Sequence, residues 1–238
     1  MKQLVYIIFF VSLFWISANR SEAQSTNILP KSEFTVVHTN DYYQKTIAHD
    51  TMKQMVVIKK YIPNIEIDFI YATASNFTHQ ILYKKPKAYL RLAAVKALLS
   101  VANLLKVKGL GLLIYDAYRP YSITKIMWQI ISDERYTANP AKGSGHNRGI
   151  AVDLTLYDLH TGKALEMPTT FDDFTEKAHH NYMQLDSLVL KNRTLLKTVM
   201  EQNGFIALET EWWHYYLPNA SKYELLDFDF KQMKKLAK

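Results

Sequence analysis

The sequence predicts a single α+β domain, with a central, mainly antiparallel sheet flanked by helices. Segments with strand and helix character are interspersed along the chain, and no internal repeat or low-complexity linker divides them. The segments with the clearest β character, residues 150–156 and 205–217, lack the regular spacing of β-α-β units, which disfavours a parallel sheet. Residues 24–238 are long enough to form one such domain with a substantial core.

The first half of this domain contains a lead-in, a strand region and a long helix. Residues 24–50 are polar and irregular, and we expect them to be loosely attached. Residues 56–71 are rich in β-branched and aromatic side chains, and a Pro-Asn pair interrupts them, so they predict one or two strands. Leucine, valine and alanine recur at helical spacing over 88–106, and Gly109 follows where such a helix should stop.

The second half adds strands and helices in alternation. Residues 110–116 predict a buried strand, and a helix is expected over 122–133 with the serine at its start as the cap. Apolar residues alternate with small or polar ones over 150–156, which is typical of a strand. Residues 193–203 predict a further helix, because Gly204 is well suited to the position just past its end.

The first 23 residues have the features of a secretory signal peptide. Lys2 supplies positive charge, an apolar run extends over residues 4–16, and Ser21-Glu22-Ala23 offers small residues at the two positions that a signal peptidase reads. An uncleaved membrane anchor is the alternative, but a spanning helix needs about 20 apolar residues, more than this run provides. We therefore expect residues 1–23 to be removed, leaving an exported domain, 24–238, with no stable membrane anchor.

The composition limits the chemistry that this domain can use. The chain contains no cysteine, which excludes disulfides and cysteine-based zinc sites and leaves His, Asp and Glu as metal ligands. The formal net charge is +7, and the lysines are scattered apart from the basic segment 231–238. A nucleic-acid-binding protein would carry a clustered basic stripe within a recognition module, so we expect no nucleic-acid partner. The sequence carries no signal for the oligomeric state.

A first motif with candidate metal ligands lies at residues 144–153. A glycine-containing turn brings His146 to the start of a strand, and Asp153 then lies on the less apolar face of that strand. A carboxylate in an apolar strand is costly to bury unless it is paired or bound to a metal ion. Taken alone, the motif also fits a structural explanation in which Asp153 pairs with Arg148.

A second motif, Glu211-Trp-Trp-His214, places a carboxylate three residues before a histidine. Catalytic zinc needs three protein ligands, an open position for water and a nearby carboxylate that accepts a proton. His146, Asp153, His214 and Glu211 supply that set. In a regular strand, however, residues three apart point to opposite faces. Either the strand is bulged at one of the two tryptophans, or Glu211 precedes its regular part.

A third motif, Tyr115-Asp-Ala-Tyr-Arg-Pro120, ends the strand predicted over 110–116. The proline turns the chain, so Arg119 should lie at the rim of the sheet. Arginine is suited to bind a substrate carboxylate or a developing oxyanion through two parallel hydrogen bonds. An ion pair between Arg119 and Asp116 is an equally good explanation of this motif alone.

Together the three motifs resemble the M15 family of zinc D,D-peptidases, and within it the D-alanyl-D-alanine dipeptidase branch. The resemblance extends from about Asp68 to Phe230 and depends on the pattern Ser-x-His-x-x-Gly-x-Ala-x-Asp followed later by Glu-x-x-His. It implies an α+β fold of the D,D-peptidase and hedgehog type. The segments that match, in the same order along the chain, are 71–78, 116–120, 146–149, 151–156, 171–172, 179–180 and 211–215.

The resemblance implies a role for each of five residues. His146, Asp153 and His214 would hold one zinc ion per chain. Glu211 would act as general base and then as general acid. Arg119 would stabilise the oxyanion of the tetrahedral intermediate.

The resemblance also implies how a dipeptide would be bound. Tyr71, Ser144 and Asp172 would line its pocket, with Asp172 near the free ammonium group. This sequence departs from the family pattern at Gly145, where a serine is common, and at Pro168, where a glycine is common. Both departures lie beside the pocket and bear on specificity, whereas the metal ligands are unaffected.

The function implied is zinc-dependent hydrolysis of the D-Ala-D-Ala dipeptide to free D-alanine, in the periplasm or outside a bacterial cell. The alternative within enzymes is a D,D-carboxypeptidase or endopeptidase that acts on peptidoglycan stem peptides, which would need an open cleft. A non-catalytic module that binds zinc or cell-wall sugars is a third possibility. Such a module should lack the catalytic base, and Glu211 is present.

Overall fold

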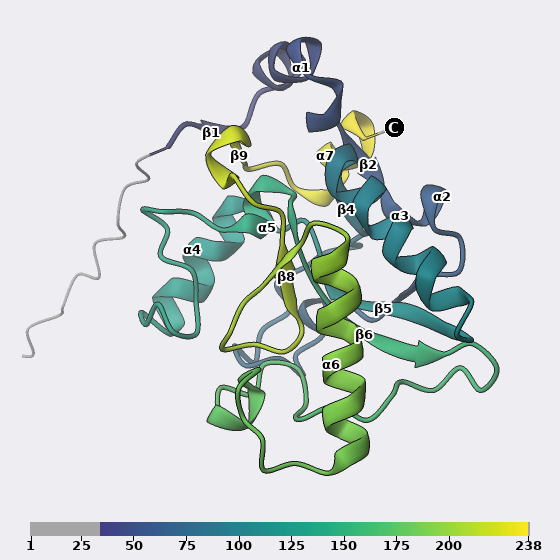
Figure 1. The fold of residues 1–238 in the computed structure, drawn as a ribbon. Coiled ribbons are helices and arrows are strands. Elements are labelled where there is room, and N and C mark those ends of the chain that lie inside the picture. Colours follow the sequence, from purple (N-terminus) through teal and green to yellow (C-terminus); the bar gives the residue numbers. More distant parts are fainter. Residues whose placement is uncertain (1–33, 238) are drawn as a thin grey trace, which may run out of the picture.

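The computed structural model describes residues 34–237, so the expected signal peptide at 1–23 lies outside the described residues. These residues form one α+β domain built around a mixed sheet (Figure 1). None of the helices in this part of the chain is both long enough and apolar enough to cross a membrane.

The central sheet has five strands in the order β3-β5-β6-β8-β7. β3 and β5 are parallel, and every other neighbouring pair is antiparallel, which confirms the mainly antiparallel sheet. β5 and β6 form its long central pair, so the strand predicted over 110–116 is confirmed. The strands are β3 (Glu66–Ile67), β5 (Leu110–Asp116), β6 (Ala151–Asp158), β7 (Ile206–Ala207) and β8 (His214–Tyr216).

Two small sheets connect distant parts of the chain. β1 pairs in parallel with β9, which joins the first described residues to the C-terminal region. β2 pairs with β4 in antiparallel fashion. Their bounds are β1 (Val36–Val37), β2 (Met55–Val57), β4 (Tyr89–Arg91) and β9 (Leu225–Leu226).

The main core lies between the sheet and two long helices. Figure 1 shows α3 and α6 side by side across β5 and β6, and both helices pack on these strands. Leu98 of α3, Val152 and Leu154 of β6 and Leu196 of α6 are fully buried in this core. The helices are α1 (Asn40–His49), α2 (Ile58–Tyr61), α3 (Leu92–Lys106), α4 (Tyr121–Ile130), α5 (Gly145–Arg148), α6 (Ser187–Gln202) and α7 (Phe230–Leu236). Short 3-10 turns are η1 (Thr51–Lys53), η2 (Ile70–Ala72), η3 (Glu176–Ala178) and η4 (Ala220–Lys222).

Several local expectations were wrong, each for a local reason. The lead-in expected to be irregular contains α1, whose N-cap, Thr39, accepts a hydrogen bond from the backbone of Tyr42. Ser122 does not cap α4: the helix begins one residue earlier, and the Ser122 N–H donates to Asp227. The region 205–217 forms two short strands, because a turn interrupts it before His214.

Candidate active site

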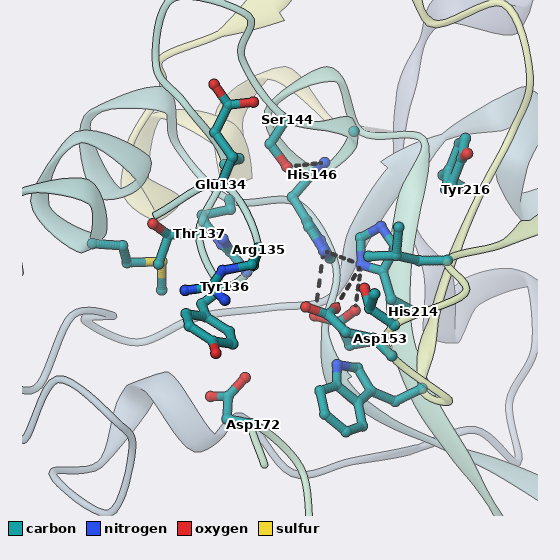
Figure 2. Close-up of a pocket in the computed structure, with 18 of the residues that line it drawn as sticks. Glu134, Arg135, Tyr136, Thr137, Ser144, His146, Asp153, Asp172, His214 and Tyr216 are labelled. Carbon is teal, nitrogen blue, oxygen red and sulfur yellow. Dashed lines mark hydrogen bonds and ion pairs between the residues drawn. The ribbon is translucent and has the colours of Figure 1, made fainter. Parts of the chain in front are cut away.

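Three side chains that can bind a metal converge at one end of the interior strands β6 and β8 (Figure 2). The register between β6 and β8 places Asp153 directly opposite His214, and α5 brings His146 to the same point. His214 Nδ1 lies 2.8 Å from Asp153 Oδ1, and His146 Nε2 lies 3.3 Å from Asp153 Oδ2. The two imidazole nitrogens are 3.2 Å apart. One ion can therefore contact all three residues.

Local sequence features fix α5 in the position that presents His146. Ser144 caps this single turn, and with Asn147 it forms a reciprocal capping box. Gly149 ends the turn in the left-handed conformation, φ 69°, which glycine adopts without a steric penalty. Gly145 has no room for a side chain, since a Cβ there would lie 2.8 Å from that of Ala151. The common serine of the family could not be accommodated here without a backbone shift.

The donor set fits zinc. His146 Nδ1 lies 2.7 Å from the carbonyl oxygen of Ala117, so it carries the proton and leaves Nε2 free to bind a metal. Zinc with ligands at about 2.0–2.2 Å in tetrahedral geometry would separate its donor atoms by about 3.3–3.6 Å, near the two longer distances observed. Burial opposes ionisation of Asp153, but His146 and His214 outweigh it and lower the pKa of this carboxyl, so Asp153 is anionic.

Glu211 lies beside this cluster and precedes the regular part of β8. The chain turns at Glu211–His214, where the His214 N–H donates to the Glu211 carbonyl oxygen. This turn resolves the spacing problem, because Glu211 is outside the strand and its Oε2 lies 3.9 Å from His214 Nδ1. Burial raises the pKa of the Glu211 carboxyl to about 7 despite the opposing effect of His214. A carboxyl with this pKa is suited to both accepting and releasing a proton near neutral pH.

Arg119 forms a buried ion pair and also faces the cavity. Its Nε and Nη2 donate to Asp116 Oδ2 at 3.0 and 2.8 Å. Against the cost of burial, Asp116 raises the pKa of Arg119, so the guanidinium remains charged. The guanidinium carbon also lies 5.2 Å from the ring centre of Tyr71, a cation–π contact. The ion pair with Asp116 and a substrate-binding role for Arg119 are therefore compatible.

Next to the metal cluster is a cavity of about 480 Å³. Tyr71 and Asp172 lie together in its wall, where the Tyr71 hydroxyl donates to Asp172 Oδ1 at 3.1 Å. The other carboxylate oxygen, Oδ2, is buried and has no hydrogen-bond partner within the described residues. Asp172 also has a left-handed backbone, φ 60°, which is uncommon for residues other than glycine.

The structure brings all eight sequence-predicted residues to this cavity. The residues that line it include Tyr71, Arg119, Ser144, His146, Asp153, Asp172, Glu211 and His214. Sequence reasoning missed the long loop after α4, which contributes Arg135, Tyr136 and Thr137 to the wall (Figure 2). A loop of this length between two helices is itself a signal for function. His180 does not support the metal site, since its ring makes no hydrogen bond within the described residues.

An N,O,N donor cluster with an adjacent carboxylate of raised pKa and a cavity-facing arginine defines a metal-dependent hydrolase. Comparison with known proteins then identifies the family. The chain belongs to the M15 peptidases described as D-Ala-D-Ala dipeptidases, whose family model matches residues 51–234. It is a zinc metallopeptidase.

Two relatives that are similar in sequence agree with this assignment. The chain is 37% identical over 177 residues to the D-alanyl-D-alanine dipeptidase of Escherichia coli (strain K12), which covers 74% of this chain and 91% of the relative. It is 32% identical over 192 residues to that of Enterococcus faecium, which covers 71% and 93%. Among solved structures, LdcB LD-carboxypeptidase is similar over 78% of both chains, with a TM-score of 0.41 and 18% identity. VanYB in complex with D-alanine-D-alanine covers 58% of this chain and 77% of its own, with a TM-score of 0.37 and 13% identity.

Proposed function

We propose that this enzyme hydrolyses the free dipeptide D-Ala-D-Ala to D-alanine, with one zinc ion held by His146, Asp153 and His214. Two relatives named D-alanyl-D-alanine dipeptidase support this choice of substrate. The match covers 91% and 93% of the lengths of these relatives. The observation that carries the proposal is the unpartnered, buried Oδ2 of Asp172, located in the same cavity as the metal cluster. A carboxylate oxygen in that position is suited to a positively charged group of the substrate.

The residues around the metal cluster have different roles in the proposed reaction. When bound, zinc supplies Lewis-acid chemistry that activates water and polarises a carbonyl group. Glu211 takes the proton from the attacking water and returns it to the leaving amine, a task suited to its pKa of about 7. Arg119 donates hydrogen bonds to the oxygen on which negative charge develops. Glu211, the proton acceptor, and Arg119, a fixed positive charge, thus line the same cavity.

The ammonium group of the substrate would distinguish a dipeptide from a longer chain. Burial raises the pKa of Asp172 well above its ordinary value, and the negative charge of Asp153 adds to this effect. An arriving ammonium offsets both, because an opposite charge nearby favours the ionised carboxylate. The resulting charge-assisted hydrogen bond contributes about 1.5–3 kcal/mol. A longer peptide has a neutral amide at that position and gains no such interaction.

Kinetic assays of the zinc-loaded enzyme test the proposal. D-Ala-D-Ala, L-Ala-L-Ala, D-Ala-D-lactate and a peptidoglycan stem pentapeptide are assayed side by side. We expect the free D,D-dipeptide to be cleaved with the highest kcat/KM, by a factor of about 10²–10⁴ over the pentapeptide. Equal or faster cleavage of the pentapeptide would replace this proposal with the carboxypeptidase alternative.

We propose further that the enzyme is exported and acts in the periplasm or outside the bacterial cell. The support is the composition of residues 1–23, with a basic start, a short apolar run and small residues before Gln24.

A further inference from the structure

Asp116 is a fully buried carboxylate that lies behind the cavity wall. Asp116 is 0% exposed. Its Oδ1 accepts hydrogen bonds from the Tyr83 hydroxyl and from the backbone N–H of Ala117, both at 2.8 Å. Its Oδ2 accepts the two bonds from Arg119. A surface ion pair would give a carboxylate far fewer than these four hydrogen-bond donors. The four bonds together hold the Asp116 side chain in one position.

A β-bulge aims Asp116 at the active site. The pairing of β5 with β6 matches Ile114 to Leu154 and then Asp116 to Asp153, so β5 has one extra residue, Tyr115, at this point. Side chains directly opposite each other in a sheet project from the same face. In a regular strand Tyr115 would share the face of the metal ligand Asp153, and the bulge gives that place to Asp116.

The two bonds from Arg119 use one side of its guanidinium. Nε and Nη2 donate to Asp116, and within the described part of the chain no hydrogen bond engages Nη1. Because the guanidinium is planar, fixing one side also fixes the direction of the other. Arg119 lines the cavity, so its unused donors are the ones that a substrate oxygen there could engage.

Asp116 also acts on the metal site through Ala117. The carboxylate holds the Ala117 N–H, and the carbonyl oxygen of Ala117 receives the proton of His146 Nδ1 at 2.7 Å. Asp116 Oδ2 itself lies 3.8 Å from that nitrogen. One carboxylate therefore orients the arginine directly and supports the tautomer of the proposed metal ligand His146 through a single residue, Ala117.

We propose that Asp116 is a positioning residue whose carboxylate directs Arg119 toward the developing oxyanion. This inference rests on the proposed function, in which Arg119 stabilises that charge. Without Asp116 the guanidinium would still be present, but its direction would no longer be fixed, and transition-state stabilisation would fall more than substrate binding.

A double-mutant cycle tests this proposal, with wild type, Asp116→Asn, Arg119→Ala and the double variant. Asn keeps the size of Asp but turns an NH2 group or an uncharged oxygen toward the guanidinium. We expect Asp116→Asn to lower kcat about 10–100-fold, to change KM less than 3-fold and to retain zinc by elemental analysis. In the Arg119→Ala background the same change should cost less than 3-fold, because the partner through which it acts is absent.

Tyr83→Phe is the matched control, since it removes another bond to Asp116 and leaves the Arg119 pair in place. We expect it to lower kcat less than 5-fold. Equal losses from Asp116→Asn in both backgrounds would show a general structural role and overturn the proposal, as would an unimpaired single variant. The same cycle is measured by calorimetry with a phosphinate analogue of the dipeptide, whose binding reports the Asp116–Arg119 coupling. If wild type binds the analogue with that coupling but cleaves no D-Ala-D-Ala, the proposed function fails and the positioning role stands.

Discussion

Each key side chain of the site is held by a second group that determines which of its atoms faces the cavity. His146 is fixed by the carbonyl oxygen of Ala117, and Arg119 is fixed by Asp116. Asp172 is held at one oxygen by Tyr71, and its other oxygen is left unpartnered. Because these partners use only part of each side chain's hydrogen-bonding capacity, the remainder is available to the metal ion and the substrate.

Substitutions of the proposed metal ligands and of the proposed base should have different effects on zinc binding. Changing His146, Asp153 or His214 to Ala should abolish zinc binding, because each removes one of three donors. Glu211→Ala should retain zinc and lose about 10²–10⁴-fold in kcat, the usual contribution of general acid–base catalysis. Elemental analysis and turnover are measured on the same preparations. A zinc-free or fully active Glu211→Ala protein would contradict the assignment.

The charge of Asp172 should determine the preference for a free amino terminus. Asp172→Asn keeps the shape of the side chain and removes the charge that would pair with the ammonium. We expect kcat/KM for D-Ala-D-Ala to fall about 10²-fold, and that for N-acetyl-D-Ala-D-Ala to fall less than 5-fold. The two substrates are compared in wild type and variant. An equal loss on both would show that Asp172 maintains the pocket and does not select the substrate.

At the scale of elements, continuous patterns and the mainly antiparallel sheet were predictable, whereas the irregularities of its strands were not. The strand at 110–116 follows from a continuous apolar run, and Gly204, with φ 88°, lies just past α6 as expected. The bulge at Tyr115 and the turn at 211–214 depend on partner strands far away in the sequence, so local propensity could not predict them. That His146, Asp153 and His214 would lie together was predictable because their motifs are specific, whereas the buried environment of Asp116 is a property of the folded sheet.

The end of α5 should tolerate a side chain poorly. Gly149→Ala places a Cβ 2.7 Å from the sulfur of the buried Met55, in addition to the cost of the left-handed backbone. Gly109 has a similar φ, 71°, with no atom within 4 Å of the added Cβ, and is the matched control. We expect Gly109→Ala to lower the free energy of unfolding by about 1–2 kcal/mol. Gly149→Ala should cost about 1–3 kcal/mol more. Urea denaturation measures both, and equal losses would exclude overpacking at Gly149.

His180, two residues after the end of η3, should make the fold sensitive to acid. Burial lowers the pKa of His180 to about 4, and the positive charge of Lys197 adds to this. The unfolded chain binds the proton more readily, with a pKa of about 6.5. Stability is therefore full above about pH 6.5 and is lost as the pH falls toward 4, by up to roughly 3 kcal/mol. His180→Leu should lose less stability than wild type between pH 7 and 5, and His160→Leu, at an exposed position, should behave as wild type. Identical pH profiles for wild type and His180→Leu would refute this role.

For the whole molecule, a buried arginine joins segments near residues 53 and 224 to the active-site turn. Arg91 is 0% exposed and donates to the carbonyl oxygens of Lys53, Arg148 and Glu224. Lys53 also pairs with the Glu224 carboxylate at 2.7 Å. Arg148 ends α5, the turn that carries His146, so N-terminal and C-terminal segments are held against the element that presents His146 to the cavity. The domain contains no cysteine and thus joins these segments through charge-assisted hydrogen bonds, without disulfides.

Removal of the N-terminal segment should leave this assembly intact. Cleavage after Ala23 would retain every element described here, since the first of them is β1 at Val36. We expect the mature protein to begin at Gln24 or within a few residues of it, because Ser21-Glu22-Ala23 follows a short apolar run. Mass spectrometry of protein recovered from the native cell envelope gives the N-terminus directly, and recombinant 24–238 should match it in zinc content and kcat. Intact Met1 on protein from the cytosolic fraction would contradict export.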